Sequence, residues 1–310
     1  MDIGKQSSNR LKDIFSKKEI KLEMNEILKL ENVSYIYGRG TPFEKLALDN
    51  VTVSFERGKI TGLIGHTGSG KSTLVNLLNG LYKPTEGRVF LDGEDIWTNP
   101  KEIHKIRYRV GLVMQYPEYQ LFDETVREDI AFAPKNLGLS EDEIAERVSE
   151  SAGFVGIGED VLDKSPFDLS GGQKRRAAIA GIIAMRPEVL VLDEPAAGLD
   201  PRGRREILGG LRLYAERSGA TVILVSHSME DMAHYCDNVV VMNSSRVYKS
   251  GTTAEIFSDP DALSEVGLDV PAVAKIAREL CRRGVNLTGT LYTVEGVRDA
   301  IIAYMKGGTA

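Results

Sequence analysis

A glycine-rich run in the first quarter of the chain has the residue types and spacing to hold phosphate. It reads GHTGSGKST, fits the pattern G-x-x-x-x-G-K-S, and lies between an apolar run and a helical pattern. Glycines let backbone N–H groups curl around phosphate oxygens where a β-carbon would obstruct, and the next helix points its positive end at them. A ligand-free turn is the alternative, which both flanks disfavour. The predicted nucleotide contacts are Gly65, His66, Thr67, Gly68, Ser69, Gly70, Lys71, Ser72 and Thr73.

Roles within this run follow from chemistry. Lys71 would reach the β- and γ-phosphates of a nucleotide, and the Ser72 hydroxyl would bind Mg²⁺. His66 occupies a variable position of the pattern, so no catalytic role is predicted for it.

A second small-residue run lies about a hundred residues downstream. Ser170, Gly171, Gly172 and Gln173 precede a predicted helix, so free N–H groups at its start could bind an anion. An ordinary serine N-cap is the alternative. A second phosphate site would be redundant within one chain, and it makes sense if it closes on nucleotide held by a second, head-to-tail chain.

Polar residues at the ends of two apolar runs could carry out hydrolysis. Asp193 ends the run 189–192, which suits a magnesium carboxylate, and Glu194 can act as general base toward water. His227 follows the run 221–225 and can reach the γ-phosphate. A merely polar strand end is the alternative for the acidic pair.

Two further residues complete the predicted site. Gln115 ends an apolar run, so its amide could bind Mg²⁺ or water, or simply cap a strand. Tyr37 could stack on adenine, or pack as a strand aromatic. The predicted catalytic residues are therefore Glu194, His227 and Gln115, and the predicted metal ligands are Ser72, Gln115 and Asp193.

The pattern of apolar residues predicts the elements that position these groups. Continuous Val/Leu/Ile runs separated by helical stretches are typical of a parallel sheet buried on both faces. Alternating runs at 27–35 and 51–55 indicate half-buried strands. The predicted strands also include 60–64, 87–93, 110–114, 189–192, 221–225 and 239–242, and the predicted helices are 71–81, 124–132, 140–148 and 173–184, with one that begins at Pro271.

The same pattern divides the chain into three predicted parts. Residues 1–26 are predicted to be a disordered N-terminal extension. Residues 27–255 are predicted to form an α/β nucleotide-binding domain with a helical insertion at about 116–168. Residues 256–310 form a small α-rich C-terminal extension, a candidate dimerisation element.

Composition sets limits on function. The 310 residues are 42% hydrophobic, with a net charge of −6 and a pI of about 5.5, and this acidic balance argues against a nucleic-acid partner. No run reaches 18 apolar residues, so no bilayer-spanning segment is expected. The two cysteines show no metal or disulfide spacing, and both are expected in the core.

These motifs together resemble the ATP-binding cassette (ABC) ATPases over about residues 28–250. The resemblance implies a P-loop NTPase fold with a mostly parallel core sheet, an antiparallel β subdomain and an inserted helical subdomain. It identifies Tyr37 as the adenine-stacking aromatic, residues 65–73 as Walker A and Gln115 as the Q-loop glutamine. The signature would be Leu169 to Gln173, Walker B would end at Asp193, Glu194 would be the catalytic glutamate, Asp200 the D-loop aspartate and His227 the switch histidine. Ala196 departs from the Thr or Ser usual after Asp-Glu-Pro.

A narrower resemblance points to the energy-coupling factor (ECF) group, in particular its A-prime ATPase. It is carried by the runs QYPEYQLF at 115–122, FAPKNLG at 132–138, SPFDL at 165–169 and GLDVP at 267–271. It implies ATP and Mg²⁺ as cofactors and a heterodimer with a second ATPase subunit. It also implies a transmembrane coupling subunit, a substrate-capture subunit for a vitamin or a metal such as cobalt, and peripheral attachment at the cytoplasmic face of the membrane.

Three alternatives remain open at this point. One is a soluble non-transport ABC ATPase, which usually carries coiled coils or two cassettes that this chain lacks. Another is a non-hydrolysing scaffold, against which Glu194 and His227 argue. The third is a generic ABC importer of another solute. Some carboxylates after the Q-loop are also predicted to receive basic residues of a membrane subunit, or else simply to start a solvated helix; they are Glu118, Asp123, Glu124 and Glu128.

Overall fold

A six-stranded sheet forms the centre of the protein. The computed structural model describes residues 25–307, and its large sheet has the order β10-β9-β3-β8-β7-β6. All neighbours are parallel except the edge strand β10. Because β7 and β8 are covered on both faces, they read as unbroken apolar runs. The strands are β3 (Ile60–Gly65), β6 (Val110–Val113), β7 (Val189–Asp193), β8 (Thr221–Val225), β9 (Asn238–Asn243) and β10 (Arg246–Thr252).

A smaller antiparallel sheet lies over one face of the first. Its order is β2-β1-β4-β5, with β1 (Glu26–Tyr37), β2 (Lys45–Glu56), β4 (Glu86–Leu91) and β5 (Glu94–Asp95). Helix α2 (Lys71–Leu78) packs between the sheets, and apolar residues of both sheets form one core with it. Strand β2 begins at Lys45 rather than at Val51, because irregularities in the β1–β2 pairing interrupt the alternation that the sequence pattern relies on.

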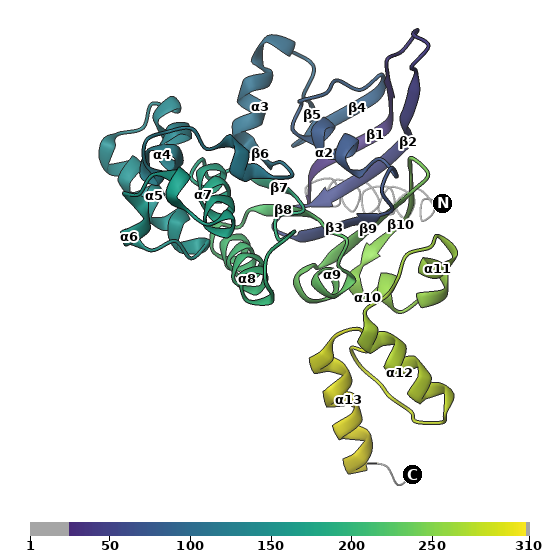
Figure 1. Cartoon of the computed structure of the whole chain (residues 1–310). Helices are drawn as coiled ribbons and strands as arrows, with labels where there is room; N and C mark the ends of the chain where they lie inside the picture. Colours follow the sequence, from purple (N-terminus) through teal and green to yellow (C-terminus); the bar gives the residue numbers. More distant parts are fainter. Residues whose placement is uncertain (1–24, 308–310) are drawn as a thin grey trace, which may run out of the picture.

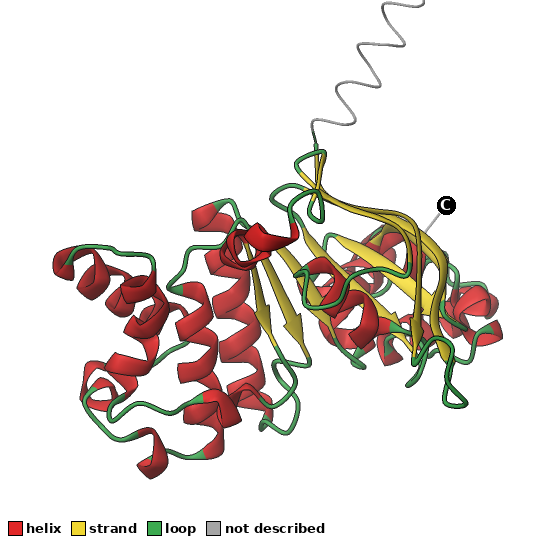
Figure 2. Ribbon diagram, turned by 90° about the horizontal axis from the view of Figure 1, so that it is seen from above, coloured by secondary structure: helices red, strands yellow, loops and turns green. Residues whose placement is uncertain are grey.

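A group of helices lies beside the β6 edge of the large sheet (Figures 1 and 2). They are α4 (Val126–Asn136), α5 (Glu141–Phe154), α6 (Glu159–Leu162) and α7 (Gly171–Ile183), with the short turns η2 (Pro117–Gln120) and η3 (Pro166–Asp168). A capping box of Ser140 and Glu143 opens α5, and a second box opens α4. Since α7 packs on α4 and α5, the helical layer extends past the predicted limit at 168.

Helix α3 (Ile103–Arg109), which follows η1 (Pro100–Glu102), packs against the core that the two sheets share. The remaining helices cover the opposite face of the large sheet or form the C-terminal extension. They are α8 (Pro201–Ser218), α9 (Met229–Tyr235), α10 (Thr253–Phe257), α11 (Pro260–Glu265), α12 (Ala272–Arg282) and α13 (Val294–Gly307). Helices α12 and α13 pack around a small core of their own, below the sheets in Figure 1. Cys236 is buried as expected, whereas Cys281 is exposed on α12, so that expectation was wrong for Cys281.

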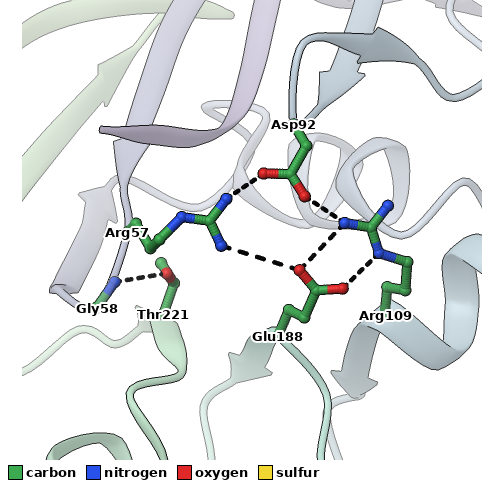
Figure 3. Close-up of polar contacts among 6 residues, drawn as sticks. All are labelled: Arg57, Gly58, Asp92, Arg109, Glu188 and Thr221. Atoms are coloured by element: carbon green, nitrogen blue, oxygen red, sulfur yellow. Dashed lines mark hydrogen bonds and ion pairs between the residues drawn. The ribbon is translucent and has the colours of Figure 1, made fainter. Parts of the chain in front are cut away.

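Four charged side chains form a closed ring where the amino ends of the parallel strands meet the antiparallel sheet (Figure 3). Arg57 and Arg109 each contact both Asp92 and Glu188. One Nη of Arg109 lies 3.1 Å from Glu188 Oε2, and one Nη of Arg57 lies 3.9 Å from the same oxygen. Because Asp92 follows β4 and Glu188 precedes β7, the ring joins the two sheets at the edge opposite the glycine-rich loop.

Most of the predicted N-terminal extension, residues 1–24, lies outside the described residues, and Glu26 already belongs to β1. The predicted boundary at 255 falls within α10. None of the helices in residues 25–307 combines the length and the apolar character that crossing a membrane requires. The predicted fold class, α/β with a mostly parallel sheet, an antiparallel β subdomain, inserted helices and an α-rich extension, is confirmed.

Candidate nucleotide-binding site

A cavity of about 290 Å³ opens at the carboxyl edge of the large sheet. It is lined by the glycine-rich loop, the ends of β7 and β8, and the β1–β2 hairpin. From the predicted site it includes Tyr37, Thr67, Gly68, Gly70, Lys71, Ser72, Thr73, Gln115, Asp193, Glu194 and His227. The sequence motifs are therefore brought together from five separate parts of the chain.

Glycines shape the loop that enters α2. Gly65 has a φ of 152°, and a β-carbon there would lie 2.4 Å from the Met242 carbonyl oxygen. Gly70 has a φ of 103°, and a β-carbon there would lie 2.6 Å from the carbonyl oxygen of Ala47. Gly68 also has a positive φ but faces open space. The loop is therefore tightly packed at its two ends and open at its middle, where a ligand would approach.

Lys71 lies almost fully buried at the base of the cavity. Its Nζ donates to the carbonyl oxygens of Gly65, at 2.6 Å, and His66, at 2.9 Å. Burial lowers the pKa of Lys71, while the nearby charges of Glu194 and Asp193 act in the opposite direction. A buried ammonium that rests only on neutral carbonyls would be stabilised by an anionic ligand.

The side chains of Ser72 and Asp193, two of the predicted Mg²⁺ ligands, lie in contact. The Ser72 hydroxyl donates to Asp193 Oδ2 at 3.2 Å, so both oxygens lie beside the same space. Burial raises the pKa of Asp193, and the Ser72 hydrogen bond and Lys71 charge partly offset this effect. A divalent cation would favour the ionised carboxylate and a hydroxyl ligand together.

Glu194 follows β7 at a φ of 53°, a left-handed conformation that is costly for a residue with a side chain. Its backbone N–H donates to the Val225 carbonyl oxygen at 3.1 Å, which holds this turn against β8. Burial, with the adjacent charge of Asp193, raises the pKa of Glu194 to about 7. The carboxyl group is thus poised to exchange a proton near neutral pH, as a general base requires.

His227 faces this carboxyl group from the end of β8. Its Nε2 lies 3.5 Å from Glu194 Oε1, and the imidazole is more than half exposed. Burial of part of the ring, helped by the charge of Lys71, lowers the pKa of His227. A neutral imidazole can donate one hydrogen bond toward a phosphate oxygen or water.

Tyr37 lies at the rim of the cavity. Its hydroxyl is 3.1 Å from the Thr73 hydroxyl, and Tyr35 and Tyr82 each meet the Tyr37 ring edge to face. Opposite Tyr37 in the hairpin lies Lys45. Lys45, Leu46 and Ala47 line the cavity too, and sequence reasoning missed them because it started β2 six residues too late, at Val51. The residue that pairs with Tyr37 across the β1–β2 hairpin would have pointed to this segment.

The second small-residue run does not reach this cavity within its own chain. Ser170 is an exposed N-cap of α7 and forms a capping box with Gln173. Asp200 caps α8 by accepting from the Gly203 N–H at 2.8 Å. Within residues 25–307, the cavity lining contains none of the predicted contacts Ser170, Gly171, Gly172, Gln173 and Asp200, and it also lacks Gly65, His66 and Ser69.

The carboxylates after the Q-loop are less available than the sequence suggested. Glu118 accepts two hydrogen bonds from the buried Arg175, at 2.9 and 3.1 Å. Glu128 is held by its capping box with Thr125. An acidic residue pattern cannot reveal that an arginine 57 residues away already occupies Glu118, so docking through Glu118 or Glu128 is not retained.

The residues present fit a nucleoside triphosphate with Mg²⁺. Within residues 25–307, the buried Ser69 Oγ and Glu194 Oε1 find no hydrogen-bond partner. Helix α2 begins behind Gly70 without a side-chain cap or an acidic residue in its first turn, so its N-terminal donors stay available. Ser72, Asp193 and Gln115 line the cavity and carry oxygen atoms of the kind that Mg²⁺ prefers as ligands.

Two family models match parts of this chain. The family model for ABC transporters matches residues 48–197, and a model described as an AAA domain, putative AbiEii toxin, matches residues 163–232. The first match covers the phosphate loop and the Asp193–Glu194 pair, and it indicates the ATPases of ABC transporters as the class of protein.

Relatives then give the particular group. Two are named energy-coupling factor transporter ATP-binding protein EcfA2, from Caldanaerobacter subterraneus and Clostridium perfringens. Each is 50% identical over 280 residues, which cover 90% of this chain and 98% of the relative. The chain belongs to the family of energy-coupling factor transporter ATP-binding proteins, as the sequence motifs predicted.

Solved structures agree. The structure of cbiO1 from Clostridium perfringens, described as part of the ABC transporter complex cbiONQ, has a TM-score of 0.70 and 39% identity, and covers 83% of this chain and 99% of that one. The dimeric structure of MJ0796, described as a bacterial ABC transporter cassette, has a TM-score of 0.66 and 30% identity, and covers 73% of this chain and 98% of that one.

Proposed function

We propose that this chain binds and hydrolyses ATP with Mg²⁺ to power import through an energy-coupling factor transporter. The observation that carries the proposal is the single cavity in which Lys71, the Ser72–Asp193 pair, Glu194 and His227 converge. The family of the chain names the transporter, and the cavity supplies the groups that phosphoryl transfer needs.

Each group has a chemical role in this proposal. Lys71 and the N–H groups of the loop neutralise and orient the β- and γ-phosphates, and Ser72 and Asp193 hold Mg²⁺, which supplies positive charge to the phosphate oxygens. Glu194 accepts a proton from the attacking water, and His227 donates a hydrogen bond that helps to orient the reacting groups. Tyr37 offers its ring face to adenine.

We further propose that two ATPase subunits share each nucleotide. Ser170 to Gln173 form an exposed helix start that lies outside the cavity of its own chain. Such a helix start can complete the site of a head-to-tail partner, which we take to be a second ATPase subunit. A transmembrane coupling subunit and a substrate-capture subunit for a vitamin or transition-metal ion complete the complex, with this chain peripheral at the cytoplasmic face.

Two substitutions test the chemistry. Glu194→Gln should keep ATP binding, trap a closed dimer and lower turnover by a factor of about 10² to 10⁴. Lys71→Ala should weaken ATP binding itself. Measurements of ATP affinity and phosphate release in the complex purified from solubilised membranes check both. Normal phosphate release by Glu194→Gln would remove the general-base role, and identification of the co-purified subunits would test the partners.

A further inference from the structure

The side chain of His66 connects the phosphate loop to the C-terminal extension. Its Nε2 lies 2.6 Å from the carbonyl oxygen of Val266, 200 residues later in the chain. Because a carbonyl oxygen can only accept, Nε2 carries the proton of this hydrogen bond. Val266 caps the carboxyl end of α11. The second residue of the loop is therefore tied to an element outside the core ATPase fold.

The backbone of the same histidine holds the phosphate-binding lysine. The His66 carbonyl oxygen accepts from Lys71 Nζ at 2.9 Å and from the Ser69 N–H at 3.1 Å. The position of this one peptide group therefore affects both the resting place of the ammonium group and the curl of the loop. A tether on the His66 side chain acts on the peptide that organises the cradle.

The far end of the tether is firmly anchored. Leu263 is 1% exposed and Leu268 is 9% exposed, and both pack into the main hydrophobic core on either side of Val266. The next helix of the extension is fixed as well, since the Ala272 N–H donates to Glu230 Oε1 on α9, at 3.2 Å. A carbonyl held between buried leucines gives the phosphate loop a fixed point of attachment, which a mobile carbonyl could not provide.

Gly267 makes the fit close. It has a φ of +69°, and a β-carbon there would lie 2.9 Å from His66 Nε2 and 3.3 Å from Cε1. A side chain at this position would displace the imidazole. The contact can therefore be broken from either partner, which allows two independent perturbations.

We propose that His66 is a positioning residue for triphosphate binding, held in place by residues 263–268 of the C-terminal extension. The inference rests on the proposed function, because it assigns the extension a role in ordering the ATP phosphate loop. Coupling of this kind is reciprocal. If the tether strengthens ATP binding, ATP in turn stabilises the packing of residues 263–268.

The test uses the full chain with two perturbed variants and two matched controls. His66→Phe keeps a ring but removes the donor, with His104→Phe as an exposed control. Gly267→Ala pushes on the imidazole, with Gly284→Ala as control, since Gly284 has a φ of +90° and nothing near its β-carbon position. Calorimetry with ATP–Mg²⁺ and with adenosine measures each affinity, and hydrogen exchange follows residues 263–268.

Loss of one neutral hydrogen bond corresponds to about a two- to twelve-fold change in affinity. We expect ATP binding to weaken by that factor in His66→Phe and Gly267→Ala, adenosine binding to stay within about two-fold, and both controls to match wild type. In steady-state turnover the KM for ATP should rise while kcat is retained. ATP should slow exchange in residues 263–268 of wild type but not of His66→Phe.

Several results would overturn the inference. One is ATP binding by both variants as tight as that of their controls, and another is an effect confined to one of the two variants. Equal losses for ATP and adenosine would indicate a damaged pocket rather than a displaced loop and would also contradict it. In all these cases wild-type ATP binding would leave the proposed function standing, whereas wild type that binds no ATP would refute the proposed function itself.

Discussion

Glu194 gives the sharpest prediction, because its placement for chemistry costs stability. Its side chain is 14% exposed, and burial with the Asp193 charge raises its pKa from 4.5 to about 7. Between these two values the folded protein keeps a proton that the unfolded chain has released. Stability therefore falls as pH rises through this window and levels off above pH 7. At 1.36 kcal/mol per pH unit, ionised Glu194 destabilises the fold by about 3 kcal/mol.

Glu194→Gln removes that cost, because the amide is neutral at every pH. In nucleotide-free buffer with EDTA, we expect it to raise the free energy of unfolding by about 3 kcal/mol at pH 8 and by only about 1 kcal/mol at pH 5. Urea denaturation at the two pH values measures this. Glu94→Gln, at an exposed carboxyl on β5, should change stability by less than about 0.5 kcal/mol. A Glu194→Gln protein no more stable than wild type at pH 8, or equally stabilised at both pH values, would refute the reasoning.

Three further predictions concern turnover and ion pairs. Because the base must be ionised, kcat/KM for ATP hydrolysis should fall about ten-fold per pH unit below about pH 7, and a flat profile would exclude Glu194 as the base. Glu118→Ala leaves the buried Arg175 charge unpaired and should lower the free energy of unfolding, measured by urea denaturation, by about 3 to 5 kcal/mol. Glu124→Ala, at an exposed residue, is the control, and equal losses in the two variants would contradict the pairing. Asp92→Asn breaks half-exposed contacts of the charged ring and should lower the free energy of unfolding by less than about 1 kcal/mol, and this loss should be smaller in high salt.

The sequence predicted the core of the site because its chemistry is local. The run 65–73 and the Asp193–Glu194 pair carry their own strand and helix context, so their positions followed from strand order at one sheet edge. Lys45 escaped prediction, because the register of a bulged hairpin depends on pairing across a turn. Arg175 escaped for a similar reason, since contacts between distant residues leave no local pattern.

Helix α8 illustrates another limit. Its buried residues Ile207, Leu208, Leu211 and Tyr214 have helical spacing, but three glycines, Gly203, Gly209 and Gly210, lower its intrinsic propensity. Gly210 is required by packing, since a β-carbon there would lie 1.8 Å from the Phe154 carbonyl oxygen. The formation and the bounds of α8 therefore depend on its packing against the rest of the protein, which the local sequence pattern does not show.

The charged ring lies at one end of the antiparallel sheet, so a small rotation there would displace the opposite end of the sheet. Strand β1 runs from Glu26, near the ring, to Tyr37 at the nucleotide rim, and its 12 residues span about 40 Å. Over that arm, a tilt of about 2° at the ring would shift Tyr37 by more than 1 Å, about a third of the ~3.5 Å contact distance between packed atoms. The four charges therefore hold the end of β1 that lies opposite Tyr37, and together with the core they fix the direction in which this strand presents the aromatic ring.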